Sequence, residues 1–129
     1  MKRFELWLAY LPTMKKSDSK DECRPVIIIS DDDPCESTSN VTIVPVTRNL
    51  TSPQRSTHVL LNRCCLDRPG RALCEQVMLL NRSRLVCRIG CVEDSFERFS
   101  INHALAAHLG LTQAIYIQED TIYGTPRTV

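Results

Sequence analysis

A series of short, β-branched apolar segments, separated by polar or proline-containing connections, most constrains what this chain can fold into. Segments of four to nine residues rich in Val, Ile and Leu and bounded by turn residues are typical of β-strands. We therefore predict six strands, over residues 4–10, 25–30, 41–47, 57–61, 72–80 and 85–92. In the first of them Phe4, Leu6, Leu8 and Tyr10 occupy alternate positions, as expected for a strand with one buried face.

The periodicity changes near the end of the chain. A set of residues recurs there at helical spacing: Ile101, Ala104, Leu105, His108 and Leu109. Asp94 with Glu97 three positions later resembles a capping box, and Gly110 suits the position just after a helix. We predict one helix over about residues 94–109, and a single helical turn over residues 81–84.

Six strands followed by one helix predict a mainly β fold with α: a small, strongly bent antiparallel sheet or barrel with the helix packed on it. A length of 129 residues corresponds to about one domain. We expect that domain to cover residues 1–111, and residues 112–129 to form a C-terminal extension. The hydrophobic fraction of 43% excludes a disordered chain.

Charge is balanced overall, with a net charge of +1, so no whole-molecule field attracts nucleic acid or a membrane. No apolar run approaches the roughly 20 residues needed to cross a bilayer, and we identify no signal peptide, so a cytoplasmic protein is expected. Residues 41–111 nevertheless contain nine arginines and no lysine. This distribution fits either a local phosphate-binding surface or a solvated surface with scattered ion pairs.

Seven cysteines, without a Cys-x-x-Cys pair, indicate reduced thiols rather than a disulfide framework or a zinc site. We expect no metal and no cofactor. The chain lacks a glycine-rich phosphate loop, a His-Glu-x-x-His motif and a Gly-x-Ser-x-Gly motif. Of the three histidines, His103 and His108 are expected to be structural, and His58 in a strand is a candidate acid or base. Composition and spacing thus indicate a β-rich domain with a candidate phosphate-binding patch.

The order of segments resembles the MazF/PemK family of bacterial toxins. The matching pieces are residues 7–11, 24–30, 41–47, 57–61, 72–76, 83–85 with 88–90, 101–105 and 109–111. They follow the family's order and spacing across about residues 3–111. The resemblance implies an SH3-like barrel that forms a homodimer. It also implies a metal-independent endoribonuclease that cleaves single-stranded RNA at short sequences and is held inactive by a small cognate antitoxin.

The resemblance also implies site residues. The family's catalytic arginine falls on Arg24 and its catalytic threonine on Thr47, while Ser17 and Gln76 fall on positions that bind substrate. Further candidate RNA-binding residues are Arg48, His58 and Arg84. Arginine donates paired hydrogen bonds to phosphate oxygens, and a threonine hydroxyl adds a third donor. RNA carries its own nucleophile, the 2′-hydroxyl, so the expected products are a 2′,3′-cyclic phosphate and a 5′-hydroxyl.

Two other functions remain open at this point. One is a toxin of the related barrel fold that binds DNA gyrase without cutting RNA. The other is an RNA-binding relative with impaired catalysis, because the loop before Arg24 lacks glycine and carries Asp18, Asp21 and Glu22, which repel phosphates. The presence of both Arg24 and Thr47 favours the nuclease, since a protein that only binds has no need for that pair.

Overall fold

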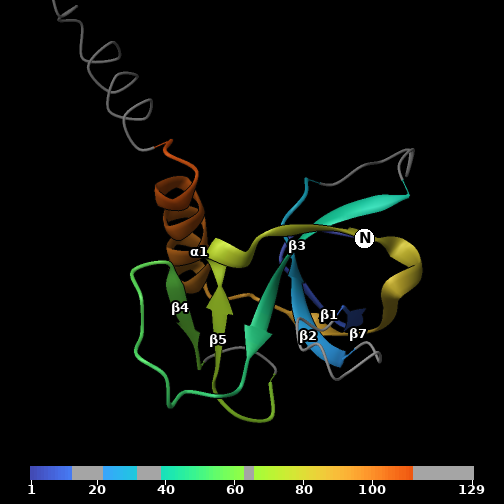
Figure 1. The fold of residues 1–129 in the computed structure, drawn as a ribbon, viewed down its shortest axis with the longest axis horizontal. Helices are drawn as coiled ribbons and strands as arrows, with labels where there is room; N and C mark the ends of the chain where they lie inside the picture. The colour runs from blue at the N-terminus through green and yellow to red at the C-terminus, as the bar shows by residue number, and fades with distance from the viewer. Residues whose placement is uncertain (13–21, 32–38, 63–65, 112–129) are drawn as a thin grey trace, which may run out of the picture.

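The computed structural model describes residues 1–12, 22–31, 39–62 and 66–111 (Figure 1). Ser17 and the predicted extension over residues 112–129 lie outside these ranges, so the statements about them stay predictions. The described residues form a seven-stranded sheet, two short 3₁₀ turns and one α-helix. In chain order these are β1 (Glu5–Leu11), β2 (Glu22–Ile28), β3 (Asn40–Thr47), β4 (His58–Leu61), β5 (Gly70–Leu73), η1 (Cys74–Gln76), β6 (Met78–Asn81), η2 (Arg82–Arg84), β7 (Leu85–Cys91) and α1 (Ser95–His108).

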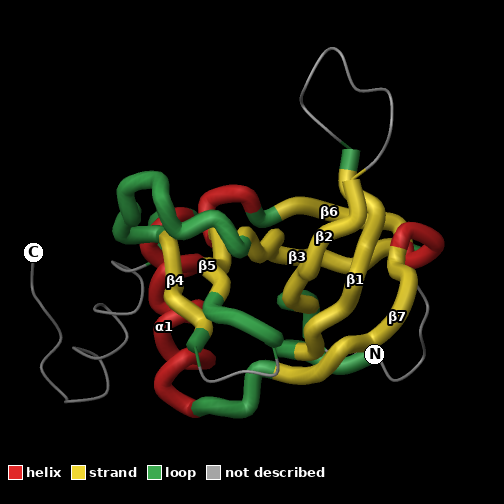
Figure 2. The backbone as a smooth tube through the Cα atoms, turned by 90° about the horizontal axis from the view of Figure 1, so that it is seen from below, coloured by secondary structure: helices red, strands yellow, loops and turns green. Residues whose placement is uncertain are grey.

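All the strand pairs are antiparallel, and the order along the sheet is β4-β5-β3-β2-β1-β7, with β6 also paired to β3. β3 is the central strand because its first half pairs with β6, its middle with β2 and its last two residues with β5. Figure 2 shows the strands curving around a common interior, with α1 beside β4. The predicted fold class, a bent antiparallel sheet with one C-terminal helix, is confirmed.

Buried apolar side chains cover both faces of the sheet, which explains why the middle strands are rich in Val and Ile and lack a strict alternation of polar and apolar residues. Ile27 belongs to the cluster that includes the helix residues, whereas its neighbours Val26 and Ile28 belong to a second cluster. β3 behaves in the same way, with Ile43 in the second cluster and Val44 in the first. Successive residues of a strand point to opposite faces, so each of these strands contributes to two cores.

The helix is built largely as its sequence predicts. Asp94 caps α1, its carboxylate accepting a hydrogen bond from the Glu97 N–H at 2.9 Å. Ile101, Ala104 and Leu105 are buried against the sheet. Gly110 follows the helix with a φ of +73°, a backbone conformation that glycine adopts without steric cost.

The predicted single strand over residues 72–80 is wrong. The chain leaves β5 after Leu73, makes the turn η1, and forms the separate strand β6 with a different partner segment. Pairing along β3 explains the break, because β5 and β6 pair with opposite ends of that one strand. The sheet therefore has seven strands instead of about six, and Gln76 lies in a turn instead of a strand.

Two predicted burial patterns are also wrong. His108 is exposed and not part of a buried stripe, because the last turn of α1 projects beyond β4 and β5 (Figure 1). In β1, Ala9 and Leu11 are buried while Tyr10 is 48% exposed. Register shifts against β7 at two points along β1 break the simple alternation expected for a flat strand.

Candidate functional site

An open cavity of about 410 Å³ lies where β3 ends and β4 begins. It is lined by Thr47, Asn49, Ser52, Pro53, Arg55, His58, Leu73, Glu75 and Gln76. Three of the residues selected from the sequence, Thr47, His58 and Gln76, therefore meet at one place. The lining mixes hydroxyl, amide, imidazole, carboxylate and guanidinium groups, which suits a polar ligand.

The sheet register explains why these residues meet. Thr47 at the end of β3 pairs with Arg71 of β5, and His58 at the start of β4 pairs with Leu73 of the same strand. β5 thus lies between the strands that carry Thr47 and His58. The turn η1 follows β5 directly and brings Glu75 and Gln76 to the same end of the sheet.

Arg24 lies on β2, the neighbour of β3 on its other side. The recorded β2–β3 pairs end at Val26 with Pro45, and Arg24 and Thr47 each lie two residues beyond that pair. Since the strands are antiparallel, both residues lie at the same end of the strand pair. Both are partly exposed, so neither is packed away in the apolar core.

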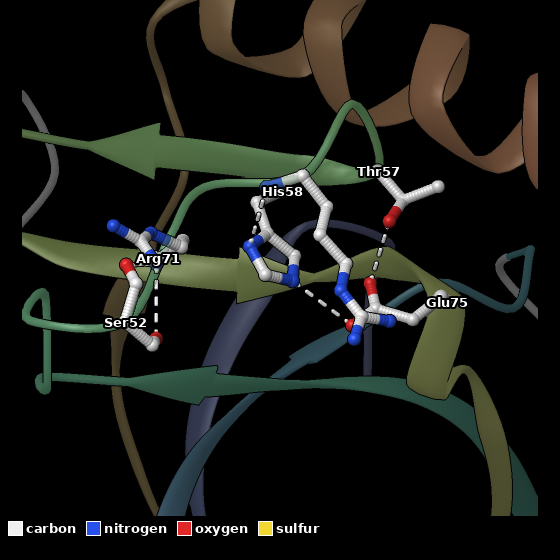
Figure 3. Close-up of polar contacts among 6 residues, drawn as sticks. Ser52, Thr57, His58, Arg71 and Glu75 are labelled. Atoms are coloured by element: carbon white, nitrogen blue, oxygen red, sulfur yellow. Dashed lines mark hydrogen bonds and ion pairs between the residues drawn. The ribbon is translucent and has the colours of Figure 1, made fainter.

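Glu75 links His58 to Thr57 at the cavity (Figure 3). The backbone N–H of Arg55 donates to His58 Nδ1 at 3.2 Å, which leaves the ring proton on Nε2. Nε2 in turn lies 2.9 Å from Glu75 Oε1, and the Thr57 hydroxyl donates to Glu75 Oε2 at 2.8 Å. Both ring nitrogens of His58 are therefore engaged, which fixes its tautomer and orientation.

The carboxylate of Glu75 has a pKa below its usual value of 4.5. Partial burial by itself raises this pKa, but hydrogen bonds from its own backbone N–H, His58 and Thr57 outweigh the burial. Glu75 is thus ionised at neutral pH, and its carboxylate accepts the hydrogen bond from the His58 ring. By contrast, burial and the neighbouring Glu75 raise the pKa of the Cys74 thiol to about 12, so Cys74 supplies no thiolate nucleophile here.

Replacing Glu75 should make the free energy of unfolding less dependent on pH in the acidic range. Because the folded pKa is lowered, the ionised carboxylate stabilises the fold fully above pH 4.5, and this contribution is lost as the pH falls through the folded pKa. At pH 7, Glu75→Gln is expected to reduce the free energy of unfolding by about 1.5 kcal/mol, since hydrogen bonds to a charged group are lost. Urea denaturation should show this difference shrinking between pH 5 and pH 3.

The matched control for this prediction is Glu93→Gln, which removes the charge of an exposed carboxylate. It should leave the unfolding free energy within about 0.5 kcal/mol of the parent at every pH. A difference between parent and Glu75→Gln that stayed constant from pH 7 to pH 3 would show that ionisation of Glu75 contributes nothing to stability.

The other selected residues do not line this cavity. The Arg48 guanidinium pairs with Asp67, with 3.2 Å between Nη2 and Oδ1. Arg84 lies in η2, and its Nη1 is 3.5 Å from the carbonyl oxygen of Tyr10. Their assignment to RNA binding stays a prediction, as does that of Ser17.

Sequence reasoning missed Asn49, Arg55 and Glu75 as cavity residues. The signal for Glu75 was its place beside Gln76 in an otherwise apolar stretch, where two polar residues mark a break in a strand. Among the described residues, no three His, Cys, Asp or Glu side chains are grouped so that they could hold a metal ion. No helix in the same ranges is long and apolar enough to span a membrane.

Comparison with known proteins identifies the same family that the order of segments resembles. The family model described as PemK-like, MazF-like toxin of type II toxin-antitoxin system matches residues 2–108. The fold is similar to the Mycobacterium tuberculosis toxin MazF-mt6, with a TM-score of 0.67 and 19% identity over 83% of this chain and 97% of that chain. No curated protein matches the sequence.

Two structures of complexes are also similar. The Deinococcus radiodurans MazE-MazF structure (Form-II) has a TM-score of 0.70 and 18% identity, covering 87% of this chain and 97% of that chain. An endoribonuclease in complex with its cognate antitoxin from a mycobacterial species has a TM-score of 0.65 and 21% identity, covering 86% and 94%. At these identities the likeness shows a shared fold.

Proposed function

Because the chain belongs to the PemK-like, MazF-like toxin family of type II toxin-antitoxin systems, we propose that it is an endoribonuclease that cleaves single-stranded RNA at short sequences without a metal ion. The observation that carries this proposal is the position of Arg24 and Thr47. They lie at one end of the adjacent strands β2 and β3, and Thr47 lines an open polar cavity. A guanidinium and a hydroxyl so placed suit a phosphodiester bound across this end of the β2–β3 strand pair.

In the proposed reaction the 2′-hydroxyl of the substrate gives its proton to water and attacks the neighbouring phosphorus, and the bond to the 5′-oxygen breaks. Arg24 donates hydrogen bonds to the phosphate oxygens, where negative charge grows in the transition state. It passes a proton to the leaving 5′-oxygen and regains one from water, so the guanidinium ends the reaction protonated. Thr47 donates its hydroxyl to the same oxygens. The products are a 2′,3′-cyclic phosphate on one fragment and a 5′-hydroxyl on the other.

The remaining cavity residues serve binding. Gln76 is exposed in η1 and its amide has donors and an acceptor for a base edge. His58 is a positioning residue in this scheme, since Arg55 and Glu75 occupy its two ring nitrogens.

Regulation by a partner follows from the family. We propose that a cognate antitoxin binds the chain and blocks the proposed RNA site at the end of β2 and β3. We also propose that the protein acts in the cytoplasm as a homodimer. One of the similar structures is an endoribonuclease in complex with its cognate antitoxin, which supports this partner class. Sedimentation at micromolar concentration should give a dimer, and a monomer alone would contradict that assignment.

The test of the function is a cleavage assay on an RNA without stable secondary structure, in buffer containing EDTA. We expect cleavage at a few positions that share a short sequence, with 5′-hydroxyl ends on the downstream fragments. Absence of cleavage combined with growth arrest on expression would favour the gyrase-binding toxin. Binding of the RNA without cleavage would favour the impaired relative.

A further inference from the structure

Arg71 is one of two charged residues, with Glu97, that are buried within the described part of the chain. It lies in β5 and is only 5% exposed. No carboxylate among the described residues pairs with it. Its Nη1 instead donates to the carbonyl oxygen of Ser52 at 3.1 Å and to the Ser52 hydroxyl at 3.4 Å (Figure 3). Its Nη2 donates to the carbonyl oxygen of Leu50 at 3.4 Å.

Such an arrangement is costly for stability alone. An arginine side chain stays protonated, and burying its charge without an ion pair is unfavourable unless nearby oxygens compensate. Here the compensation is incomplete, because the buried Nε of Arg71 has no hydrogen-bond partner. An apolar side chain of similar size would fill this place at lower cost, so the contacts that the guanidinium makes call for a further explanation.

Those contacts all go to the loop between β3 and β4, residues 48–57, which contains no helix or strand. The first half of this loop is further tied to the sheet at Thr47, whose hydroxyl accepts the Asn49 N–H at 3.1 Å. The second half is held by His58, which accepts the Arg55 N–H. Arg71 is thus the attachment of the loop between these two points.

This loop forms one wall of the cavity, through Asn49, Ser52, Pro53 and Arg55. Arg71 is also the direct cross-strand partner of Thr47, the proposed hydroxyl donor. One buried side chain therefore connects β5, the strand paired with Thr47, to the loop that forms one wall of the cavity. This cavity is where we expect the scissile phosphate and its bases.

We propose that Arg71 is a positioning residue for RNA cleavage: its guanidinium holds residues 50–52 so that the loop wall of the cavity is preformed for substrate. This inference rests on the proposed nuclease function. Arg71 itself touches neither substrate nor reacting atoms in this scheme, and acts through the carbonyls of Leu50 and Ser52.

Two substitutions of Arg71 separate the effect of its hydrogen bonds from the effects of its side-chain size and charge. Arg71→Met keeps an unbranched side chain of similar length but removes every donor, and Arg71→Lys keeps the charge but lacks the planar fork. We expect Arg71→Met to fold with a thermal midpoint equal to or above that of the parent, because a buried charge is replaced by an apolar group. Its kcat/KM for RNA should fall about ten- to hundredfold, as expected for a misplaced binding wall. Arg71→Lys should lie between Met and the parent.

Amide hydrogen exchange on the protein without RNA gives a readout independent of catalysis. In Arg71→Met, exchange should rise about tenfold in the peptide that covers residues 49–53, and stay unchanged in β6 and α1. Arg88→Met, which changes a half-exposed arginine of β7, should alter neither exchange nor cleavage.

Parent-like exchange of residues 49–53 in both Arg71 variants would overturn the proposal. Parent-like kcat/KM in Arg71→Met would overturn it as well. If Arg71→Met does not fold, the exchange and kcat/KM of Arg71→Lys decide. If the parent itself cleaves no RNA, the proposed function fails, whereas the exchange comparison still decides whether Arg71 holds the loop.

Discussion

Arg24→Ala should reduce the rate of single-stranded RNA cleavage by about 10²–10³-fold, with the fold intact. Loss of one preorganised donor to a developing oxyanion costs an amount of this order. Arg24 is partly exposed on β2, so its removal leaves no cavity in the core. The measurement is a single-turnover assay on a fluorescently labelled RNA, alongside the far-UV spectrum and the thermal midpoint of both proteins.

Arg88→Ala is the matched control. Arg88 is also a strand arginine, its side chain is 51% exposed, and its Nε donates to Glu5 at 3.0 Å, outside the cavity. We expect its cleavage rate within about twofold of the parent, since surface ion pairs contribute at most about 1 kcal/mol to stability. Equal rates for Arg24→Ala and Arg88→Ala would remove Arg24 from the mechanism.

Arg24→Lys refines this test. Lysine keeps the positive charge but presents a single ammonium point instead of two parallel N–H donors. If paired hydrogen bonds to the phosphate matter, Arg24→Lys should recover only part of the lost rate. A full recovery would mean that charge alone is sufficient and would contradict a bidentate role.

Ile101→Ala should lower the free energy of unfolding by about 2–5 kcal/mol, the usual range for removing a large buried aliphatic side chain. Ile101 is fully buried, with 0% exposure, and joins α1 to the cluster that contains Leu6, Ile27 and Val44. Truncation there leaves a cavity between helix and sheet. Urea denaturation at pH 7 measures the difference, with the slope of the transition as a check on cooperativity.

Phe96→Ala provides the comparison on the same helix. Phe96 is 72% exposed, so its truncation should change the unfolding free energy by no more than about 0.5 kcal/mol. Similar losses for Ile101→Ala and Phe96→Ala would mean that α1 is not held to the sheet through its buried stripe.

The sequence was most informative where local chemistry and tertiary packing agree. Residues 41–47 form a strand because their β-branched side chains fill two cores, and this dual burial accounts for the Val- and Ile-rich segment that predicted it. Asp94 and Gly110 likewise mark the ends of α1 through backbone needs that are local to the helix. Such features require no knowledge of the partners across the sheet.

What the sequence did not predict depends on long-range pairing. Residues 72–80 are apolar apart from Glu75 and Gln76, and the turn at these two residues follows from the pairing of β5 and β6 with opposite ends of β3. Arg71 looked like one of several surface arginines, because its burial depends on the path of the loop that covers it. The cavity forms from such pairings, so its charged and polar members were only partly identified.

For Arg24 and Thr47, residue spacing, family likeness and strand register each contributed something different. Residue spacing alone left Thr47 as an ordinary strand residue and Arg24 as a residue just before the predicted strand 25–30, and the likeness to the toxin family selected them. The register of β2 and β3 then places them at the same end of one strand pair. Their assignment as catalytic residues is our proposal, and it depends on chemistry at the substrate rather than on the fold.

The most direct measurement uses RNA with one altered sugar. Once the cleaved bond is mapped, the nucleotide on its 5′ side is replaced by its 2′-deoxy form, and the substrate is incubated with the parent protein in EDTA. We expect cleavage at that bond to disappear while other sites are still cut, because the internal nucleophile is gone. Continued cleavage at the deoxy position would contradict a reaction in which Arg24 and Thr47 assist attack by the RNA's own hydroxyl.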